Sequence, residues 1–436
     1  MIQLERTKEC RIKRANTDWW INEKAIVADN GLTYIAYITD MGEIHIKELD
    51  AKCSKTPSRD FRLRKLNCDY ADEHNAPSMC ILQNGKIIVG YTGHYVKCLR
   101  YRITEKPYDI SSFGEEKTLS FDGSVTYVQL FENTKRNELW LFTRLNGVNW
   151  QFQYSRDEGE TWSEPNVFLS SQAGGLFYLN IRKQDIANKA GGDEQWFFAL
   201  YGHPIVSEDH TIRSGIFRAD GQLTRADGTP LGYDLYDPEA GQMALEALDT
   251  VYSSPKGTTV RLLDVSPTVP LRVGFVPFIL DNRFAPSPEN PYYCSAVWKD
   301  GKWTVSKPIC KAGEFLSRNV NDGSQTYLGG MAYYYGVGNA GLYSNGYTET
   351  CTDRIYIARF DGKNRVLEAY LSTDGGETYC LEQEIRRITE KNVKIWRPTV
   401  PVHAQDNLPV YWHEGVYGAH SGGWHCDAVM LVEYDD

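Results

Sequence analysis

The sequence has no long apolar run, which limits how the chain can meet a membrane. Its first twenty residues carry charges throughout, so they contain no apolar core of a secretion signal. No stretch approaches the ~18 consecutive apolar residues that a membrane-spanning helix needs. We therefore expect a cytoplasmic protein, or a secreted one if a leader segment has been removed.

A surplus of positive charge is also missing. The chain has 47 Lys and Arg against 57 Asp and Glu, a net charge of −10. Such a balance creates no field that steers a protein onto nucleic acid or an anionic membrane. The sequence predicts neither partner, leaves the oligomeric state open, and requires a local pocket of Arg and His for any acidic ligand.

Paired cysteine motifs and interdomain linkers are absent as well. The ten cysteines are scattered and form no CxxC pair, so we expect free, mostly buried thiols rather than a disulfide framework. No Ser/Gly-rich or Pro-rich stretch divides the chain. Residues 1–436 are therefore predicted to form one domain.

Helical periodicity is scarce, and only residues 238–248 and 381–391 fit short helices. What the sequence does contain is short runs of β-branched and aromatic residues, separated by NG, DNG and DG turns. These turns are strong hairpin signals because Gly and Asn adopt positive φ at low cost. The aromatic content of 13% fits strands and sugar-facing surfaces. The predicted class is all-β.

Two segments repeat the pattern S-x-D-x-G-x-T-[WY], at residues 155–162 and 372–379. The Asp caps the amides of a tight turn, the hydroxyls close the turn, and the aromatic ring fills the space beside it. This pattern is the Asp-box, and the chain here resembles the BNR-repeat β-propellers. The resemblance implies a single β-propeller. The length of the chain fits six or seven blades, and the family resemblance favours seven.

A dense group of polar motifs precedes the first of these segments. It runs D-E-H-N-A-P at 72–77, G-H at 93–94, T-Y-x-Q at 126–129 and W-L-F-T-R at 140–144. His74 and His94 flank one predicted hairpin, and Tyr127 and Arg144 fall at the ends of the next. Together the motifs resemble the BNR-type polysaccharide lyases, which include ulvan lyases and lyases that act on L-rhamnose linked to glucuronate.

The resemblance implies β-elimination at a 4-linked uronic acid, in an acidic oligosaccharide or polysaccharide. This reaction needs a cation for the carboxylate, a base for H5 and an acid for O4. Arg144 offers a permanently charged fork for the carboxylate. His74 and Tyr127 are the candidate base and acid in either order, and His94 supports them. Weaker substrate-binding candidates are Asn75, Trp150, Tyr178, Arg182 and His203.

Two other functions stay open. A retaining or inverting glycoside hydrolase, such as a rhamnosidase, would use two carboxylates. A sialidase would share the Asp-boxes, although the sialidase F/Y-R-I-P segment has no counterpart here. A non-catalytic glycan-binding propeller would use the aromatic residues alone.

No cofactor is required by the sequence, and its metal content is left unknown. A Ca²⁺ ion remains open, either structural or bound to a carboxylate. The group of His413, His420, His425 and Cys426 matches no zinc spacing, and we expect its histidines in loops, with His413 or His420 lining the pocket.

Overall fold

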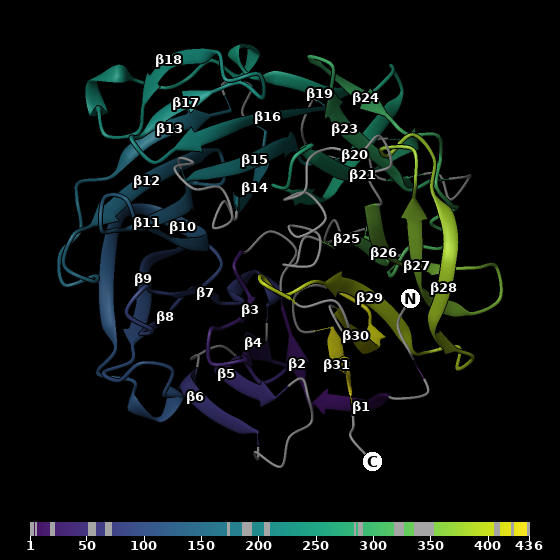
Figure 1. Cartoon of the computed structure of the whole chain (residues 1–436), viewed down its shortest axis with the longest axis horizontal. Helices are drawn as coiled ribbons and strands as arrows, with labels where there is room; N and C mark the ends of the chain where they lie inside the picture. Colours follow the sequence, from purple (N-terminus) through teal and green to yellow (C-terminus); the bar gives the residue numbers. More distant parts are fainter. Residues whose placement is uncertain are drawn as a thin grey trace.

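The computed structural model places antiparallel sheets one after another in chain order around a common centre (Figure 1). It describes residues 4, 7–17, 22–50, 58–65, 72–171, 175–184, 194–204, 210–282, 285–286, 291–317, 327–334, 353–404, 410–419 and 423–433. Helical structure in these ranges is limited to 3₁₀ turns, of which η2 (Glu73–Asn75), η3 (Ile110–Ser112), η4 (Pro238–Ala240) and η5 (Leu245–Ala247) span three residues each. The predicted all-β propeller is therefore confirmed.

The described residues form six sheets. The first contains β2 (Ala15–Asn16), β3 (Ala25–Val27), β4 (Leu32–Thr39), β5 (Glu43–Asp50) and β6 (Arg59–Lys65). The second contains β7 (Ser78–Ile81), β8 (Ile87–Thr92), β9 (Val96–Ile103), β10 (Lys117–Asn133), β11 (Glu138–Leu145), β12 (Asn149–Ser155) and β13 (Asn166–Ser170). The third contains β14 (Phe177–Gln184), β15 (Gln195–Gly202), β16 (Thr211–Arg218), β17 (Gln222–Thr224), β18 (Pro230–Asp234) and β19 (Asp249–Ser253).

The remaining three sheets complete the circle. The fourth contains β20 (Thr258–Ser266), β21 (Arg272–Asn282), β22 (Ala285–Pro286), β23 (Cys294–Lys299) and β24 (Lys302–Val305). The fifth contains β25 (Gly330–Tyr333), β26 (Asp353–Phe360), β27 (Arg365–Ser372) and β28 (Cys380–Ile388). The sixth contains β1 (Thr7–Ile12), β29 (Lys394–Thr399), β30 (Tyr411–Tyr417) and β31 (Trp424–Glu433), so the first and last strands close one sheet together.

The prediction of seven blades was wrong, because the strands of the described residues form six separate sheets. The reason is β10, a strand of 17 residues that takes part in two pairings. Its first part, residues 117–120, pairs with β9, and its last part, residues 125–133, pairs with β11. This continuous strand fuses two groups of strands into one seven-stranded sheet.

The helix predicted at 381–391 was also wrong, because most of it is strand β28. The pairing of β28 with β27 contains two register shifts. A bulge interrupts the alternation of a strand, so the buried Ile385 and Ile388 lie three residues apart and imitate a helical face. The other predicted helix, at 238–248, contains only η4 and η5.

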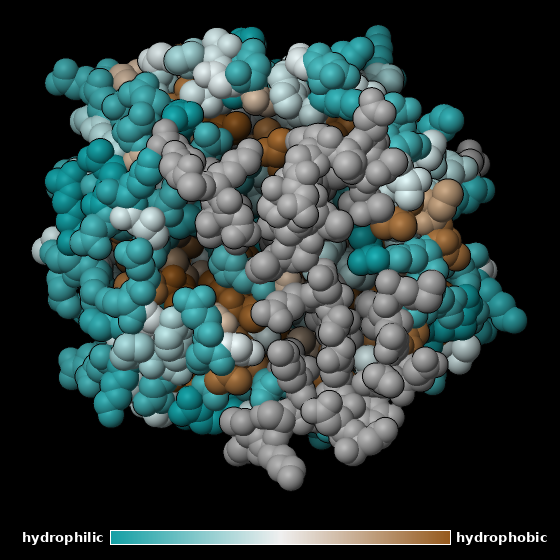
Figure 2. Space-filling model, in the orientation of Figure 1, coloured by the Kyte–Doolittle hydropathy of each residue, from teal (hydrophilic) through white to brown (hydrophobic). Residues whose placement is uncertain are grey.

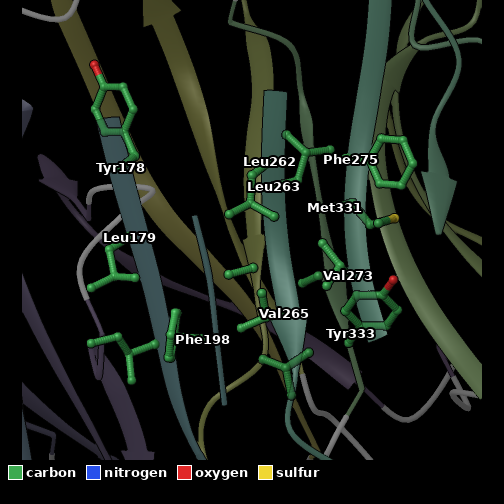
Figure 3. Close-up of a cluster of buried hydrophobic side chains, with 14 of the residues drawn as sticks. Tyr178, Leu179, Phe198, Leu262, Leu263, Val265, Val273, Phe275, Met331 and Tyr333 are labelled. Atoms are coloured by element: carbon green, nitrogen blue, oxygen red, sulfur yellow. The ribbon is translucent and has the colours of Figure 1, made fainter. Parts of the chain in front are cut away.

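The predicted hairpins are present, and their apolar faces pack between sheets. At the NG turn between β7 and β8, Gly85 has a φ of 78°, and a Cβ there would lie 2.7 Å from the Tyr108 ring. Figure 3 shows apolar side chains of β14, β20, β21 and β25 meeting between neighbouring sheets. Figure 2 shows a largely hydrophilic outer rim, with hydrophobic side chains visible nearer the middle of the face.

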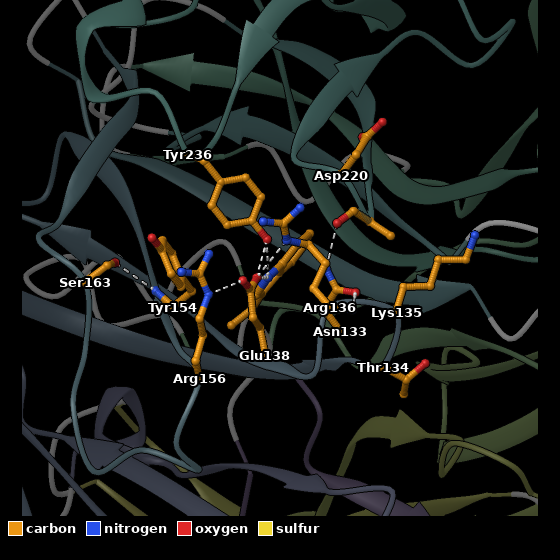
Figure 4. Close-up of polar contacts among 12 residues, drawn as sticks. Asn133, Thr134, Lys135, Arg136, Glu138, Tyr154, Arg156, Ser163, Asp220 and Tyr236 are labelled. Carbon is orange, nitrogen blue, oxygen red and sulfur yellow. Dashed lines mark hydrogen bonds and ion pairs between the residues drawn. The ribbon is translucent and has the colours of Figure 1, made fainter.

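A buried carboxylate ties the second sheet to the third (Figure 4). Glu138 on β11 accepts a hydrogen bond from Arg156 Nε at 2.9 Å and another from the Tyr236 hydroxyl, and Arg136 lies beside it. Tyr236 in turn accepts a hydrogen bond from Trp140 Nε1 at 3.1 Å. These contacts link β11 to the segment that follows β18.

The seven cysteines in the described residues are free, as expected. The expected burial holds for Cys80, Cys294 and Cys426, whereas Cys380 is exposed. Cys53, Cys68 and Cys351 lie outside the described residues. Among the residues that the structure describes, no helix has both the length and the apolar character to cross a membrane.

Candidate active site

The D-E-H-N-A-P segment forms a capped turn that fixes the first histidine. Asp72 is the N-cap of η2, and its side chain accepts a hydrogen bond from the His74 backbone N–H at 3.0 Å. The same Oδ1 is hydrogen-bonded to His74 Nδ1. Both side chains are only 6% exposed, so the main chain and the carboxylate together hold the imidazole in place.

The second histidine joins the same carboxylate from a different loop. His94 follows β8, and its Nδ1 lies 2.9 Å from Asp72 Oδ2. The His74 and His94 rings stack with centroids 4.1 Å apart and planes 9° from parallel. Burial raises the pKa of Asp72, but the two imidazoles outweigh it and hold that pKa well below its usual range. Asp72 is therefore an ionised carboxylate shared by two imidazoles.

A bulge in β10 turns Tyr127 toward this histidine pair. The register between β10 and β11 shifts from Thr126 to Val128, and Tyr127 between them has a φ of 64°. Bulges re-aim side chains in this way, and a non-glycine residue with positive φ is uncommon. The Tyr127 ring centroid lies 5.6 Å from that of His74.

Arg144 lies under the phenol ring as a buried cation. It pairs with Thr126 across the strands, and its Cζ lies 4.5 Å from the Tyr127 ring centroid, 5.2 Å from Tyr178 and 6.0 Å from Tyr95. The residue is 1% exposed. Burial lowers the pKa of Arg144, but the three tyrosines outweigh it and raise the pKa above its ordinary value.

No carboxylate pairs with Arg144 among the described residues, and its Nε and Nη1 have no hydrogen-bond partner there. Buried arginines are normally paired, because an unpaired buried charge costs several kcal/mol. A guanidinium with two open N–H groups is a receptor for a planar anion such as a carboxylate. The geometry therefore places an anion receptor beside a phenol and two imidazoles.

Three of the weaker candidates adjoin this group. Trp150 faces Arg144 across β11 and β12, and its ring lies parallel to that of Tyr127 at 6.5 Å. Tyr178 lies 6.1 Å from Tyr127, and burial raises its pKa although Arg144 lowers it. His203 extends the group outward, with its ring 5.8 Å from that of Tyr178.

The other two candidates have different surroundings. Arg182 forms buried ion pairs with Glu23 at 2.7 Å and with Asp264 at 3.3 Å, so carboxylates of the protein occupy its fork. Asn75 is buried next to His74, and its Oδ1 has no partner among the described residues.

Sequence reasoning did not select a buried group on the far side of η2. Glu73 is 2.5 Å from Arg397 Nη2 and accepts a hydrogen bond from the Tyr417 hydroxyl at 3.0 Å. Arg397 has a φ of 50° at an irregularity in the β29 and β30 pairing, much as Tyr127 has in β10. The signal available in the sequence was the W-R-P-T segment, which contains Arg397.

The C-terminal histidines do not gather into a metal cluster in the described residues, and the expected loop placement was wrong for two of them, because His413 lies on β30 and His425 on β31. His413 is fully buried and accepts a hydrogen bond from the Thr17 N–H at 3.2 Å, and burial lowers its pKa well below the ordinary value. His425 is exposed and lies 2.8 Å from Asp40. His420 lies outside the described residues. The expectation that His413 or His420 lines the pocket stays a prediction.

One group of potential metal ligands is found in the described part of the chain, at Asp72, His74 and His94, whose ligand atoms lie within 4.8 Å of one another. Ca²⁺ prefers oxygen ligands, and this group offers two nitrogens, so it does not fit the calcium expectation. Each Nδ1 has the carboxylate as its hydrogen-bond partner. The arrangement is that of a hydrogen-bonded triad.

Fold and site together define a class: a β-propeller with a buried centre of two imidazoles, a phenol and a guanidinium. The chain belongs to the BNR repeat-containing family, whose model matches residues 32–309. That range contains all nine site residues that the sequence predicted.

Curated relatives match over a shorter region. The chain is 27% identical to an ulvan lyase of Nonlabens ulvanivorans over 174 residues, which is 33% of this chain and 34% of that protein. It is 23% identical to an ulvan lyase of Alteromonas sp. (strain LOR) over 171 residues, 34% of each protein. The match thus spans about a third of the length of these relatives.

A solved structure is similar over almost the whole chain. It is an ulvan lyase of polysaccharide lyase family PL25, bound to -[GlcA(1-4)Rha3S]-. The similarity has a TM-score of 0.66 at 14% identity, and it covers 98% of this chain and 96% of that one. At this identity the likeness establishes the shared fold.

Proposed function

We propose that the chain is a carbon–oxygen lyase that cleaves a 4-linked uronic acid in an acidic oligosaccharide or polysaccharide by β-elimination. The observation that carries the proposal is Arg144, a buried guanidinium with open N–H groups and no carboxylate partner in the described residues. A uronate carboxylate has the charge and the planar shape to fill that fork.

Neutralising the carboxylate is the step that makes the reaction feasible. Once Arg144 holds it, negative charge that develops at C5 spreads onto the carboxylate, so the C5–H bond becomes acidic. A base then removes H5, a C4=C5 double bond forms, and the C4–O4 bond breaks. An acid donates a proton to O4, and the products are an unsaturated uronate and a free hydroxyl.

His74 and Tyr127 are the groups proposed to move these protons. Their ring centroids lie 5.6 Å apart, and the Tyr127 ring lies over the Arg144 guanidinium, so a carboxylate bound there would place its sugar beside both groups. Either residue is chemically able to serve as the base, and the configuration at C5 decides which one does. His94 shares the Asp72 carboxylate with His74 and supports it.

For the substrate we propose a glucuronate in a rhamnose-containing glycan. The support is the match to two ulvan lyases together with the motifs at 72–77, 93–94, 126–129 and 140–144. Of the weaker candidates, His203 is half-buried and keeps part of its ring accessible to a sugar, whereas Trp150 and Tyr178 are buried and support the site from behind.

Hydrolysis is less well supported by the same site. Two carboxylates would have to act as acid and base. Asp72 is shared by two imidazoles, Glu73 is paired with Arg397, and Asp264 pairs with Arg182 and accepts the Tyr333 N–H at 3.0 Å. None of these three carboxylates is therefore placed to act as the general acid that protonates a glycosidic oxygen.

The test is to incubate the protein with ulvan and with rhamnosyl-glucuronate oligosaccharides, and to follow ultraviolet absorbance and released sugar together. The conjugated C4=C5 bond of the product absorbs, so a lyase gives both signals. Arg144→Gln is expected to lower kcat/KM by about 10²-fold, because two charge-assisted hydrogen bonds are lost. The exposed Arg387→Gln serves as the control. Sugar release without absorbance would identify a hydrolase, and binding without release a glycan-binding propeller.

A further inference from the structure

Asp72 uses both carboxylate oxygens on imidazoles, which fixes the position of two protons. An ionised carboxylate only accepts hydrogen bonds, so the ring nitrogen that faces it must carry the proton. His74 Nδ1 faces Oδ1 and His94 Nδ1 faces Oδ2. In its neutral form each imidazole is therefore the Nδ1–H tautomer, with the lone pair on Nε2, away from Asp72.

The main chain holds Asp72 itself rigidly. Its Oδ1 also caps η2 through the His74 N–H at 3.0 Å, and the side chain is 6% exposed. A carboxylate that is anchored in this way cannot rotate to release one ring without losing the cap. The parallel stacking of the two rings, at 4.1 Å and 9°, follows from this shared anchor.

We propose that Asp72 is a positioning residue, which sets the tautomer and the orientation of His74 and His94 through its two carboxylate oxygens. Asp72 itself lies behind the rings, and its effect on the reaction passes through them. The proposal deepens the proposed elimination and rests on it for the catalytic consequence, whereas the tautomers can be measured without any substrate.

The decisive variant is Asp72→Asn. Asn is as good an N-cap as Asp, so the turn is retained. In this variant the amide oxygen continues to accept the hydrogen bonds from the His74 N–H and the His74 ring, but the amide NH₂ group now faces the His94 ring. A donor opposite Nδ1 forces His94 to move its proton to Nε2. We expect kcat to fall about 10²-fold with KM within about twofold, because orientation is lost while the Arg144 receptor is unchanged.

The tautomers are read by ¹⁵N NMR of histidine-labelled protein, which distinguishes protonated from unprotonated ring nitrogens. The chain has nine histidines, so the signals of His74 and His94 can be assigned by substituting each. Both should be Nδ1–H in the wild type, and one should switch in Asp72→Asn. The control is Asp237→Asn, which changes the N-cap of η4, where Asp237 accepts the Glu239 N–H at 2.9 Å, and should leave tautomers and kcat unchanged.

Three outcomes decide the question. An Nε2–H tautomer at His74 or His94 in the wild type overturns the proposal without any variant. Unchanged kcat in Asp72→Asn overturns it too. If the protein has no lyase activity but the tautomers are Nδ1–H and switch in the variant, the positioning role is supported and the proposed reaction is the part that fails.

Discussion

At the scale of single residues, the site separates charge recognition from proton transfer. Arg144 is held by tyrosine rings, so its guanidinium keeps N–H groups for a ligand. Tyr127 covers the same guanidinium and reaches toward His74. The phenol hydroxyl and the phenol ring thus have different tasks, and a substitution can remove one and keep the other.

Tyr127→Phe keeps the ring over Arg144 and removes the hydroxyl. We expect kcat to fall by about 10²–10⁴-fold, the usual cost of losing a proton-transfer group, with a small change in KM. Tyr101→Phe is the matched control, because its hydroxyl donates to Gly159 O at 2.6 Å on the second sheet, in a structural turn. That variant should lose thermal stability and keep its kcat. Near-normal kcat in Tyr127→Phe would remove Tyr127 from the mechanism.

At the scale of elements, the two repeated segments form turns with the same hydrogen bonds. Ser155 and Ser372 each accept the N–H of the glycine four residues on, at 2.8 Å. Asp157 and Asp374 each accept the N–H of the threonine that follows four residues later, at 2.8 and 3.0 Å. Neither turn contacts the imidazole pair, so we assign both to stability.

Asp374→Asn should therefore lower stability by about 1–2 kcal/mol, because the Thr378 hydroxyl loses its acceptor and the bonds from the Glu377 and Thr378 N–H groups lose the charge that strengthens them. Burial raises the pKa of Asp374, but the Thr378 bonds outweigh it and bring the pKa to about 2. A carboxyl whose folded pKa lies below its unfolded value, ~3.9, stabilises above that value and loses the effect as pH falls through the folded pKa.

The gap in Tm between wild type and Asp374→Asn should thus be full at pH 6 and narrower at pH 3. Thermal unfolding followed by circular dichroism measures it. Asp300→Asn removes the same charge at an exposed turn and should shift Tm little at either pH. A gap that is unchanged at pH 3 would mean that the carboxylate does not supply the stabilisation.

At the scale of the whole molecule, ion pairs at the centre join sheets that are far apart in sequence. Arg182 on β14 pairs with Glu23, which precedes β3, and with Asp264 on β20. Arg182 and Asp264 lie on two different sheets, and Glu23 lies just before β3, a strand of a third sheet. Arg182 is 4% exposed, so its two carboxylate partners depend on it for compensation of their charge.

Arg182→Met should destabilise the protein by about 3–5 kcal/mol, because Glu23 and Asp264 would remain buried without the cation that compensates their charge. Arg387→Met removes a surface arginine with two carboxylate partners, and should cost no more than about 1 kcal/mol. Urea unfolding of the two variants compares them directly. A raised KM with unchanged stability in Arg182→Met would instead restore Arg182 as a substrate contact.

The sequence by itself determined the local structure. Period-2 apolar runs and NG or DG turns specify hairpins through φ preferences and alternation, which act over a few residues, and the motifs at 72–77 and 126–129 contain the residues that the fold brings together. Only the tertiary structure decided which of the candidates meet. Asp72 and His94 are 22 residues apart, and Arg182 is bound by Glu23 and Asp264, which are 159 and 82 residues away in the sequence, so no local pattern encodes these contacts. The fusion of sheets through β10 and the bulge at Tyr127 could not be predicted from the sequence either, because strand register depends on packing between sheets.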